Sequence, residues 1–308
     1  MNKTAKTVII VLVSILLVVS LLVGIFFIVF PNHPKVQIKS AEDRINTKDK
    51  ILVASYNTAA PWGNIALGTG SVRRSNLFAK QVNDIMPDTL GVQEMNSFWV
   101  EWTRENLPQY EYYGVKRGGD ENERKSEMSG IFYLKDKFQC IENNTFWISY
   151  TPEKESEVEG AGCYRVCSYV VLKDKETGNM FAHLNTHLDN SSEEAQNLGG
   201  ELIYKKSIEL SEKYPQIKIV VTGDFNQYVD GKACTALLNN GFKNVSSVDS
   251  EKKDLLTYHG WGSNEYEGPI DFIMVNDGFV VNSYNVEQKK INHSYASDHY
   301  MITAELSF

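Results

Sequence analysis

Short polar motifs that follow apolar runs constrain the fold of this 308-residue chain more than any other feature. Short apolar runs bounded by turn residues are typical of buried strands. We therefore expect strands that deliver these polar side chains to one edge of a rigid scaffold, where loops carry function. In chain order the six motifs are Ser55-Tyr56-Asn57, Val92-Gln93-Glu94, Asn185-Thr186-His187-Leu188-Asp189, Gly223-Asp224-Phe225-Asn226, Ile270-Asp271-Phe272-Ile273 and Ser297-Asp298-His299.

The apolar patterns along the rest of the chain favour an α+β fold. Helices are predicted over 71–85 and over 191–214, where Ser191 and Glu194 form a capping box and Gly199 and Gly200 weaken the pattern. Because strands predominate, we expect a four-layer α/β sandwich, two packed sheets with helices outside. The strands are predicted over 51–56, 89–92, 131–134, 145–148, 164–172, 180–186, 217–221, 269–275 and 300–306.

An uncharged apolar stretch of 23 residues runs from Val8 to Phe30. As a helix it would be about 34 Å long, which is enough to cross a bilayer. It is longer than the apolar core of a cleaved signal peptide, and no small-residue cleavage site follows it. These features favour an uncleaved signal anchor, which forms one transmembrane helix.

The charges around this stretch predict its orientation. Lys3 and Lys6 precede it, so the positive-inside rule keeps the N-terminus in the cytoplasm, although Lys35 and Lys39 reduce the bias. We expect a single-pass protein of the cell membrane with its main domain outside the cytoplasm. The predicted parts are an anchor over 1–30 that contacts the membrane through 8–30, a polar tether over 31–50 and a domain over 51–308.

The charge balance bears on the partners of this domain. After the anchor the chain has 29 Lys and Arg residues against 39 Asp and Glu residues, a formal charge of −10. Tight non-specific binding to a polyanion needs a basic surface, so the balance argues against a pure nucleic-acid module. Carboxylates that bind a metal would account for part of the acidic excess. The sequence indicates no protein partner.

Together the six motifs resemble those of the endonuclease/exonuclease/phosphatase superfamily, across about residues 50–308. The resemblance implies a DNase-I-like sandwich of two mixed β-sheets flanked by helices. It also implies a catalytic domain that hydrolyses a phosphoester by metal-assisted in-line attack of water. Phe146-Trp147-Ile148-Ser149, Cys163-Tyr164-Arg165 and Thr257-Tyr258-His259-Gly260 resemble a bacterial subgroup of hydrolases without assigned substrates.

The resemblance and the chemistry of a phosphoester together indicate a divalent-metal site. Oxygen ligands suit Mg²⁺ or Mn²⁺, which neutralises the phosphoryl oxygens. Glu94 is the first candidate ligand, with Asn57 beside it through its amide oxygen, and Asp298 on the metal side. The family often has a carboxylate two positions after the asparagine. Here Ala59 stands at that position, which weakens the case for a second metal.

The remaining motif residues are candidates for proton transfer and charge stabilisation. Asp224 is the candidate base, and Asn226 would orient the water or the phosphate. His187 would donate to a non-bridging oxygen in the transition state. His299 would contact the phosphoryl oxygen or act as acid or base, and the resemblance implies Asp271 as its partner. Whether His187, His299 or Asp224 protonates the leaving group stays open.

The substrate stays open between several phosphoesters. Arg165 is a candidate clamp for a substrate phosphate, and His259 is a candidate pocket residue. A lipid headgroup, a sugar phosphate, a nucleotide or a nucleic acid would suit a membrane-anchored phosphoesterase. The alternatives are an extracellular nuclease of the same fold and a membrane-tethered binding protein without catalysis. The second alternative predicts loss of Glu94, Asp224 or His299, and all three are present.

Overall fold

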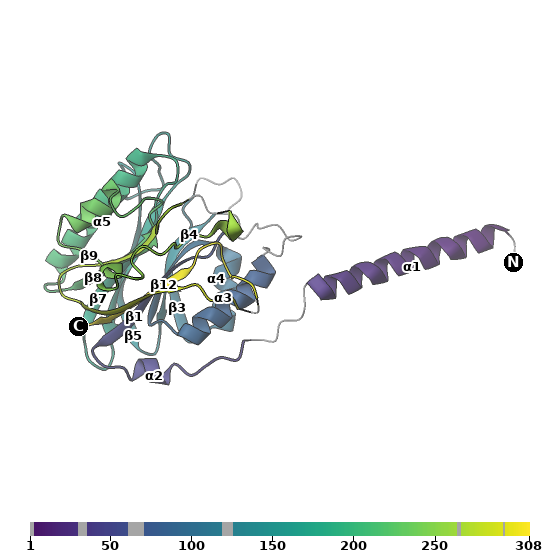
Figure 1. The fold of residues 1–308 in the computed structure, drawn as a ribbon, viewed down its shortest axis with the longest axis horizontal. Helices are drawn as coiled ribbons and strands as arrows, with labels where there is room; N and C mark the ends of the chain where they lie inside the picture. Colours follow the sequence, from purple (N-terminus) through teal and green to yellow (C-terminus); the bar gives the residue numbers. More distant parts are fainter. Residues whose placement is uncertain (1–2, 30–35, 61–70, 119–125, 264–265, 292) are drawn as a thin grey trace.

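The computed structural model describes residues 3–29, 36–60, 71–118, 126–263, 266–291 and 293–308. Two six-stranded mixed sheets pack face to face, with helices on their outer faces (Figure 1). The predicted four-layer sandwich is therefore confirmed. The first sheet has the order β11(Val280–Glu287), β12(Met301–Ser307), β1(Lys50–Asn57), β2(Thr89–Met95), β4(Met128–Leu134) and β3(Tyr110–Tyr113). The second has the order β5(Phe138–Trp147), β6(Val166–Asp174), β7(Met180–His187), β8(Lys218–Asp224), β10(Asp271–Val275) and β9(Lys243–Asn244).

Each sheet contains one parallel pair, and these two pairs position the site. β1 runs parallel to β2, with Asn57 opposite Gln93. β7 runs parallel to β8, with His187 opposite Asp224. Because parallel strands end at the same edge, each pair presents its polar motifs side by side.

Between the sheets lies an apolar core with a polar layer through its centre. Buried Asn185 donates from Nδ2 to the carbonyls of Val92 and Gly130, both at 2.9 Å, and accepts from Thr222 Oγ1 at 2.9 Å. A β-carbon at Gly91 would lie 2.4 Å from Asn185 Oδ1, so this position requires glycine. The asparagine therefore joins the two sheets just below the edge that carries the site.

The outer helices cover the two sheets separately. α3(Ser71–Ile85) and α4(Ser97–Asn106) pack on the first sheet, and α5(Glu193–Lys213) and α6(Lys232–Leu238) pack on the second. Gly200 lets α5 approach α6, because a β-carbon there would lie 2.6 Å from Ala233 Cα. The predicted capping box at Ser191 is wrong by one residue, since Ser192 Oγ accepts from Ala195 N at 3.2 Å. The glycines do not interrupt this helix.

The N-terminal helix α1(Lys3–Val29) contains a candidate membrane span, Ala5–Gly24, with a mean hydropathy of 3.1 and none of that window buried. Its length and composition are enough to cross a membrane, and a signal sequence near the N-terminus would meet the same criteria. The predicted anchor's last residue, Phe30, and residues 31–35 lie outside the described residues.

The segment 36–49, within the predicted tether, contacts the domain. It contains the short helix α2(Glu42–Ile45), and Lys39 N donates to Asn83 Oδ1 at 2.9 Å. The Arg44 guanidinium pairs with the fully buried carboxylate of Asp88, which also lies 3.3 Å from Lys137 Nζ. This part of the segment is therefore docked on the domain, although the boundaries at 30 and 50 stay a prediction.

Candidate active site

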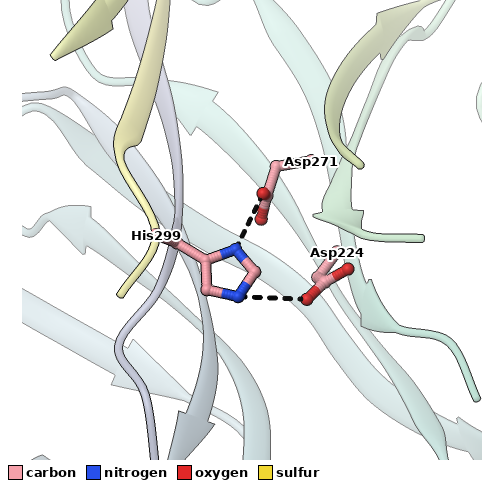
Figure 2. Close-up of side chains that lie close together, drawn as sticks. All are labelled: Asp224, Asp271 and His299. Atoms are coloured by element: carbon pink, nitrogen blue, oxygen red, sulfur yellow. Dashed lines mark hydrogen bonds and ion pairs between the residues drawn. The ribbon is translucent and has the colours of Figure 1, made fainter. Parts of the chain in front are cut away.

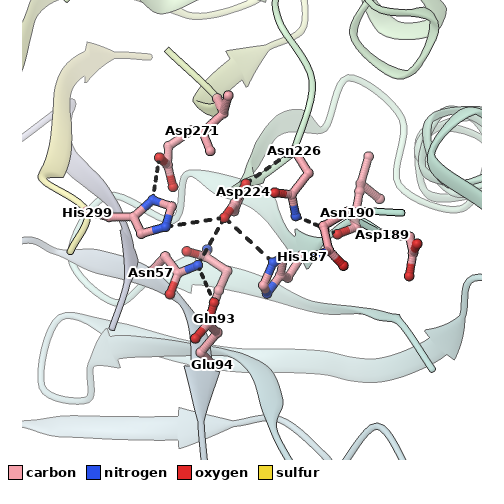
Figure 3. A network of polar contacts seen from close by, with 12 residues as sticks. Asn57, Gln93, Glu94, His187, Asp189, Asn190, Asp224, Asn226, Asp271 and His299 are labelled. Atoms are coloured by element: carbon pink, nitrogen blue, oxygen red, sulfur yellow. Dashed lines mark hydrogen bonds and ion pairs between the residues drawn. The ribbon is translucent and has the colours of Figure 1, made fainter. Parts of the chain in front are cut away.

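The ends of strands from both sheets converge at one edge of the sandwich (Figure 3). Asn57 ends β1, and Glu94 lies near the end of β2 in the same sheet. His187 ends β7 and Asp224 ends β8, while Asp271 begins the antiparallel β10 directly opposite Asp224. The sandwich thus brings together motifs that are far apart in the chain.

Asp224 is the centre of this cluster. Its Oδ2 accepts from Asn57 Nδ2 at 3.0 Å and lies 3.6 Å from His187 Nε2 and 3.7 Å from His299 Nε2. Its Oδ1 accepts from the backbone N–H of Asn226 at 2.9 Å. Burial, together with the negative charge of Asp271, raises the pKa of Asp224 to about 7.

The turn after β8 explains the geometry of Asp224 and Asn226. Asn226 has a φ of +48°, and its Nδ2 donates to the carbonyl of Leu188 at 2.9 Å. The strand therefore ends at Asp224, and the two side chains sit around one turn. Glu94 also has a positive φ, +61°. Left-handed backbone at residues other than glycine is strained and clusters at functional sites.

His299 is held by the carboxylate that the family resemblance implied. Its Nδ1 lies 2.9 Å from Asp271 Oδ2, and both side chains are buried (Figure 2). Burial lowers the pKa of His299, but the charges of Asp271 and Asp224 and the hydrogen bond to Asp271 outweigh it and raise the pKa to about 10. Tyr258 packs edge-on against the imidazole, with ring centroids 4.8 Å apart.

His187 has the opposite electrostatic environment. It is 7% exposed, and its pKa is lowered well below the usual value by burial and then by the positive charges of Arg165 and Arg117. A neutral imidazole can donate one hydrogen bond and accept another. Two histidines on either side of Asp224 therefore differ in charge.

Glu94, Asp298 and Asp224 are carboxylates at this edge, and the first two supply oxygen donors that suit a hard divalent cation. All three line the same cavity. The amide nitrogen of Asn57, and not the amide oxygen expected from the sequence, faces these carboxylates. Its Nδ2 donates to Glu94 Oε1 at 2.9 Å, and its Oδ1 accepts from Ala59 N at 3.0 Å. The reason is that neighbouring carboxylates attract an N–H donor, and rotation of the amide would exchange the two atoms.

The chemistry of this donor set fits a hard divalent cation such as Mg²⁺ or Mn²⁺, which Glu94, Asp298 and, after rotation of its amide, Asn57 would hold. A second group is also close enough to bind a metal. Ligand atoms of Asp224, Asp271 and His299 lie within 4.8 Å of one another. There, however, the hydrogen bond between His299 and Asp271 occupies one of the two ring nitrogens.

The shared cavity has a volume of about 450 Å³. Asn57 and Asp271 are not among its lining residues, and each contacts a residue that is. The predicted residues that line it are Glu94, Arg165, His187, Asp224, Asn226, Asp298 and His299. Sequence reasoning did not assign the lining residues Arg117, Glu127, Asn190, Tyr258 and Tyr266 to the site. Two signals were available, since Asn190 directly follows a named motif and Tyr258 lies within the motif Thr257-Tyr258-His259-Gly260.

His259 does not line this cavity. Its Nε2 lies 3.0 Å from the carbonyl of Ser297, and its ring packs against Tyr295 and Tyr300 at centroid distances of 4.3 and 4.6 Å. These contacts place His259 behind the Ser297-Asp298-His299 motif. His259 therefore packs behind the motif, and its contacts do not support the predicted contact with substrate.

Comparisons with known proteins agree with this geometry. The profile of the Endonuclease/Exonuclease/phosphatase family matches residues 54–299. A Bacteroides thetaiotaomicron mannosyl-6-phosphatase is 30% identical, with 84% of this chain and 100% of that chain covered and a TM-score of 0.76. A second protein from that organism, described as a member of the family, is also 30% identical, with 84% and 95% covered and a TM-score of 0.75.

More distant similarity shows the shared fold alone. The human Nocturnin catalytic domain is 17% identical, with 85% of this chain and 96% of that chain covered and a TM-score of 0.68. A comparison with curated protein sequences finds no match. The family profile, which spans all six motifs, and the two Bacteroides structures show that this chain belongs to the Endonuclease/Exonuclease/phosphatase family of phosphoester hydrolases.

Proposed function

We propose that this protein is a divalent-metal-dependent phosphoesterase, held at the cell membrane by its N-terminal helix. One observation carries the proposal above all. Asp224 lies between two histidines while the carboxylates of Glu94 and Asp298 line the same cavity, which combines groups for proton transfer with oxygen ligands for a cation. A bound Mg²⁺ or Mn²⁺ would neutralise the phosphoryl oxygens and polarise the phosphorus.

Within this proposal Asp224 is the base that accepts a proton from the attacking water. The N–H of Asn226 fixes one of its oxygens, and the other lies among Asn57, His187 and His299. The Asn226 side chain lines the cavity and helps to place the water or the phosphate.

The two histidines stabilise the charge that develops on the phosphoryl oxygens. Asp271 fixes the His299 ring through Nδ1, so Nε2 is the atom that can reach the reacting group. His187 lies on the other side of Asp224 and can donate to a non-bridging oxygen. The protonated ring of His299 can also deliver the proton that the leaving group requires, whereas neutral His187 can only donate a hydrogen bond.

The membrane part of the proposal rests on α1 and on the lysines that precede its apolar stretch. Ala5–Gly24 is long and apolar enough to span a bilayer. Lys3 and Lys6 favour a cytoplasmic N-terminus and therefore an extracytoplasmic catalytic domain. Every proposed catalytic residue follows this helix, so the anchor and the site are separate parts of the chain.

The compared proteins support phosphoester hydrolysis and leave the ester open. One is named a mannosyl-6-phosphatase, and another fold neighbour was solved with a single-stranded DNA product. A panel of phosphomonoesters, phosphodiesters, lipids and nucleic acids tests the proposal on the full-length protein in detergent, with and without Mg²⁺. Turnover that needs the cation is the expected result. Absence of cation-dependent turnover across the panel would contradict it.

A further inference from the structure

The cavity has a second chemical feature besides its carboxylates, a buried guanidinium group. Arg165 is 6% exposed, and its Nη2 donates to Asn190 Oδ1 at 3.1 Å. Its Nε lies 3.5 Å from Asp189 Oδ2. Nη1 and Nε have no hydrogen-bond partner among the described residues. A buried donor without a partner is costly, and in native proteins it commonly indicates a missing ligand, ion or water.

Asp189 holds this arginine in place without satisfying it. The carboxylate of Asp189 already accepts from the backbone N–H groups of Gly162, Ser191 and Ser192, at 2.8 to 3.2 Å. These bonds fix the carboxylate, and the carboxylate fixes the guanidinium in the wall of the cavity. The site is therefore preorganised, since the charged group is positioned before any ligand binds.

A second arginine lines the same part of the cavity. Arg117 pairs with Glu127 through Nη1 at 2.7 Å, while its buried Nε has no hydrogen-bond partner among the described residues. The charges of both arginines act on His187, whose pKa they lower after burial does. The guanidinium groups therefore lie on the His187 side of the cavity.

We infer that Arg165 and Arg117 form a subsite for the third terminal oxygen of a phosphomonoester, so that the protein acts on monoesters in preference to diesters. This inference rests on the proposed function and names its substrate class. A monoester carries nearly two negative charges at pH 7 and three strong acceptor oxygens. A diester carries one charge and has an ester-linked carbon where the third oxygen would be.

The difference in charge decides between the two classes. A guanidinium that is nine-tenths buried gains most from an ionised acceptor that supplies charge-assisted hydrogen bonds. An ester oxygen with its alkyl group supplies no charge, and it would leave Nη1 of Arg165 buried without a charged partner. A cation held by the carboxylates would contact the other phosphoryl oxygens in both classes, so it discriminates less between them.

The test compares ligands that differ by a single methyl group. Binding of methyl phosphate and dimethyl phosphate to the full-length protein in detergent with Mg²⁺ is measured by calorimetry. Hydrolysis of p-nitrophenyl phosphate and methyl p-nitrophenyl phosphate is measured in parallel. We expect methyl phosphate to bind at least about 10-fold more tightly than dimethyl phosphate. Arg165→Gln should weaken methyl phosphate binding about 10- to 100-fold, since bonds to charged groups are the strong ones.

Controls separate the subsite from the fold and from catalysis. Arg104→Gln makes the same chemical change at an exposed surface ion pair with Glu111 and should leave all four measurements unchanged. If circular dichroism shows that Arg165→Gln is unfolded, Arg117→Gln, at a less buried position, provides the same comparison.

Two results would overturn the inference. One is a diester that binds or reacts as well as its monoester partner. The other is an affinity for methyl phosphate within about twofold of wild type in folded Arg165 and Arg117 variants. If both esters are hydrolysed equally, the proposed phosphoesterase stands and the monoester subsite fails. If neither is hydrolysed but methyl phosphate binding depends on Arg165, the subsite stands and hydrolysis fails.

Discussion

His299 Nδ1 lies 2.9 Å from Asp271 Oδ2, and Nε2 of the same ring lies 3.7 Å from Asp224 Oδ2. One carboxylate therefore fixes the imidazole, and the other nitrogen faces the cluster that lines the cavity. The first contact joins β10 of the second sheet to the loop before β12 of the first sheet, so it also depends on the packing of the sandwich.

This relationship predicts different losses for the two members of the pair. His299→Ala removes a donor to the transition state and should lower kcat roughly 10²- to 10³-fold. Asp271→Ala should have a smaller effect, since it frees the ring without deleting it. Asp271→Asn keeps the shape and removes the charge, so it should fall between wild type and Asp271→Ala. Steady-state kinetics on any substrate found would check this order, and equal loss in Asp271→Ala and His299→Ala would contradict it.

Asp224→Asn should remove most of the turnover while the fold stays intact. The amide cannot accept a proton from water, and loss of a general base typically costs about 10²- to 10⁴-fold. The amide oxygen can still accept from the Asn226 N–H, so the turn should survive. The double variant with His299→Ala should lose less than the product of the two single losses. Near wild-type kcat in a folded Asp224→Asn protein would place the base elsewhere.

Chelation should abolish activity, and added Mg²⁺ or Mn²⁺ should restore it. The reason is that Glu94, Asp298 and Asp224 supply a cluster of negative charge that a phosphate enters only with a cation present. Glu94→Gln should raise the Mg²⁺ concentration needed for half-maximal rate. Full activity in EDTA would contradict the metal requirement, and circular dichroism would control for unfolding.

The buried residue His183, which lies outside the site, leads us to predict that the stability of the protein depends on pH. It is fully buried between the sheets, with its ring nitrogens 2.7 Å from the hydroxyls of Thr89 and Thr222. Burial lowers its pKa to about 3, whereas the unfolded chain titrates at an ordinary value near 6.5. Between pH values of about 3 and 6.5 the unfolded state therefore binds one more proton than the folded state. The folded state becomes less stable as the pH falls through this range.

The sign follows from that proton difference. The free energy of unfolding should be highest above about pH 6.5 and fall by up to about 1.4 kcal/mol per unit as pH decreases towards 3. His183→Asn removes this titration, so its unfolding free energy should depend less steeply on pH than that of wild type. Urea unfolding at pH 5 and 7 checks the difference. Parallel pH profiles would contradict the assignment to His183.

The chain order of polar strand ends predicted the core of the site because short apolar runs mark buried strands locally. Apolar runs predicted the strands before Asn57, Glu94, His187 and Asp224, and parallel pairing brings such ends together. The orientation of the Asn57 amide was not predictable, since it depends on carboxylates from both sheets. Arg117 lies outside every named motif, and only the tertiary fold brings it to the cavity.

Other helices and strands were not predicted because the apolar residues in their sequences have no clear periodic spacing. The edge strand β11 buries one side chain, Tyr284, and reads as a polar segment. The edge strand β5 also lacks a clear pattern in its first part, where Gln139, Ile141 and Asn143 are exposed. Helix α4 begins at the cap Asn96, whose Oδ1 accepts from Trp99 N at 3.0 Å. Its short length hid an amphipathic pattern that the cap could have revealed.

The docked segment 36–49 leads to the last prediction. Asp88 is fully buried, accepts from Leu52 N and pairs with Arg44 and Lys137, and the Lys137 side chain is only 1% exposed. Asp88→Asn would leave a buried ammonium without its counter-charge. Breaking a buried pair in this way costs about 3–5 kcal/mol of unfolding free energy.

Asp84→Asn is the matched control for this change. Asp84 also contacts the docked segment, through Lys39, but both side chains are largely exposed. An exposed pair contributes about 0–1 kcal/mol, so this variant should unfold almost as wild type does. Urea unfolding followed by tryptophan fluorescence measures both variants, and limited proteolysis reports whether residues 36–49 become accessible. Because Asp88 holds Arg44, Asp88→Asn should expose the segment to protease, whereas Asp84→Asn should not. Equal unfolding free energies for the two variants would show that the buried carboxylate does not hold the segment to the domain.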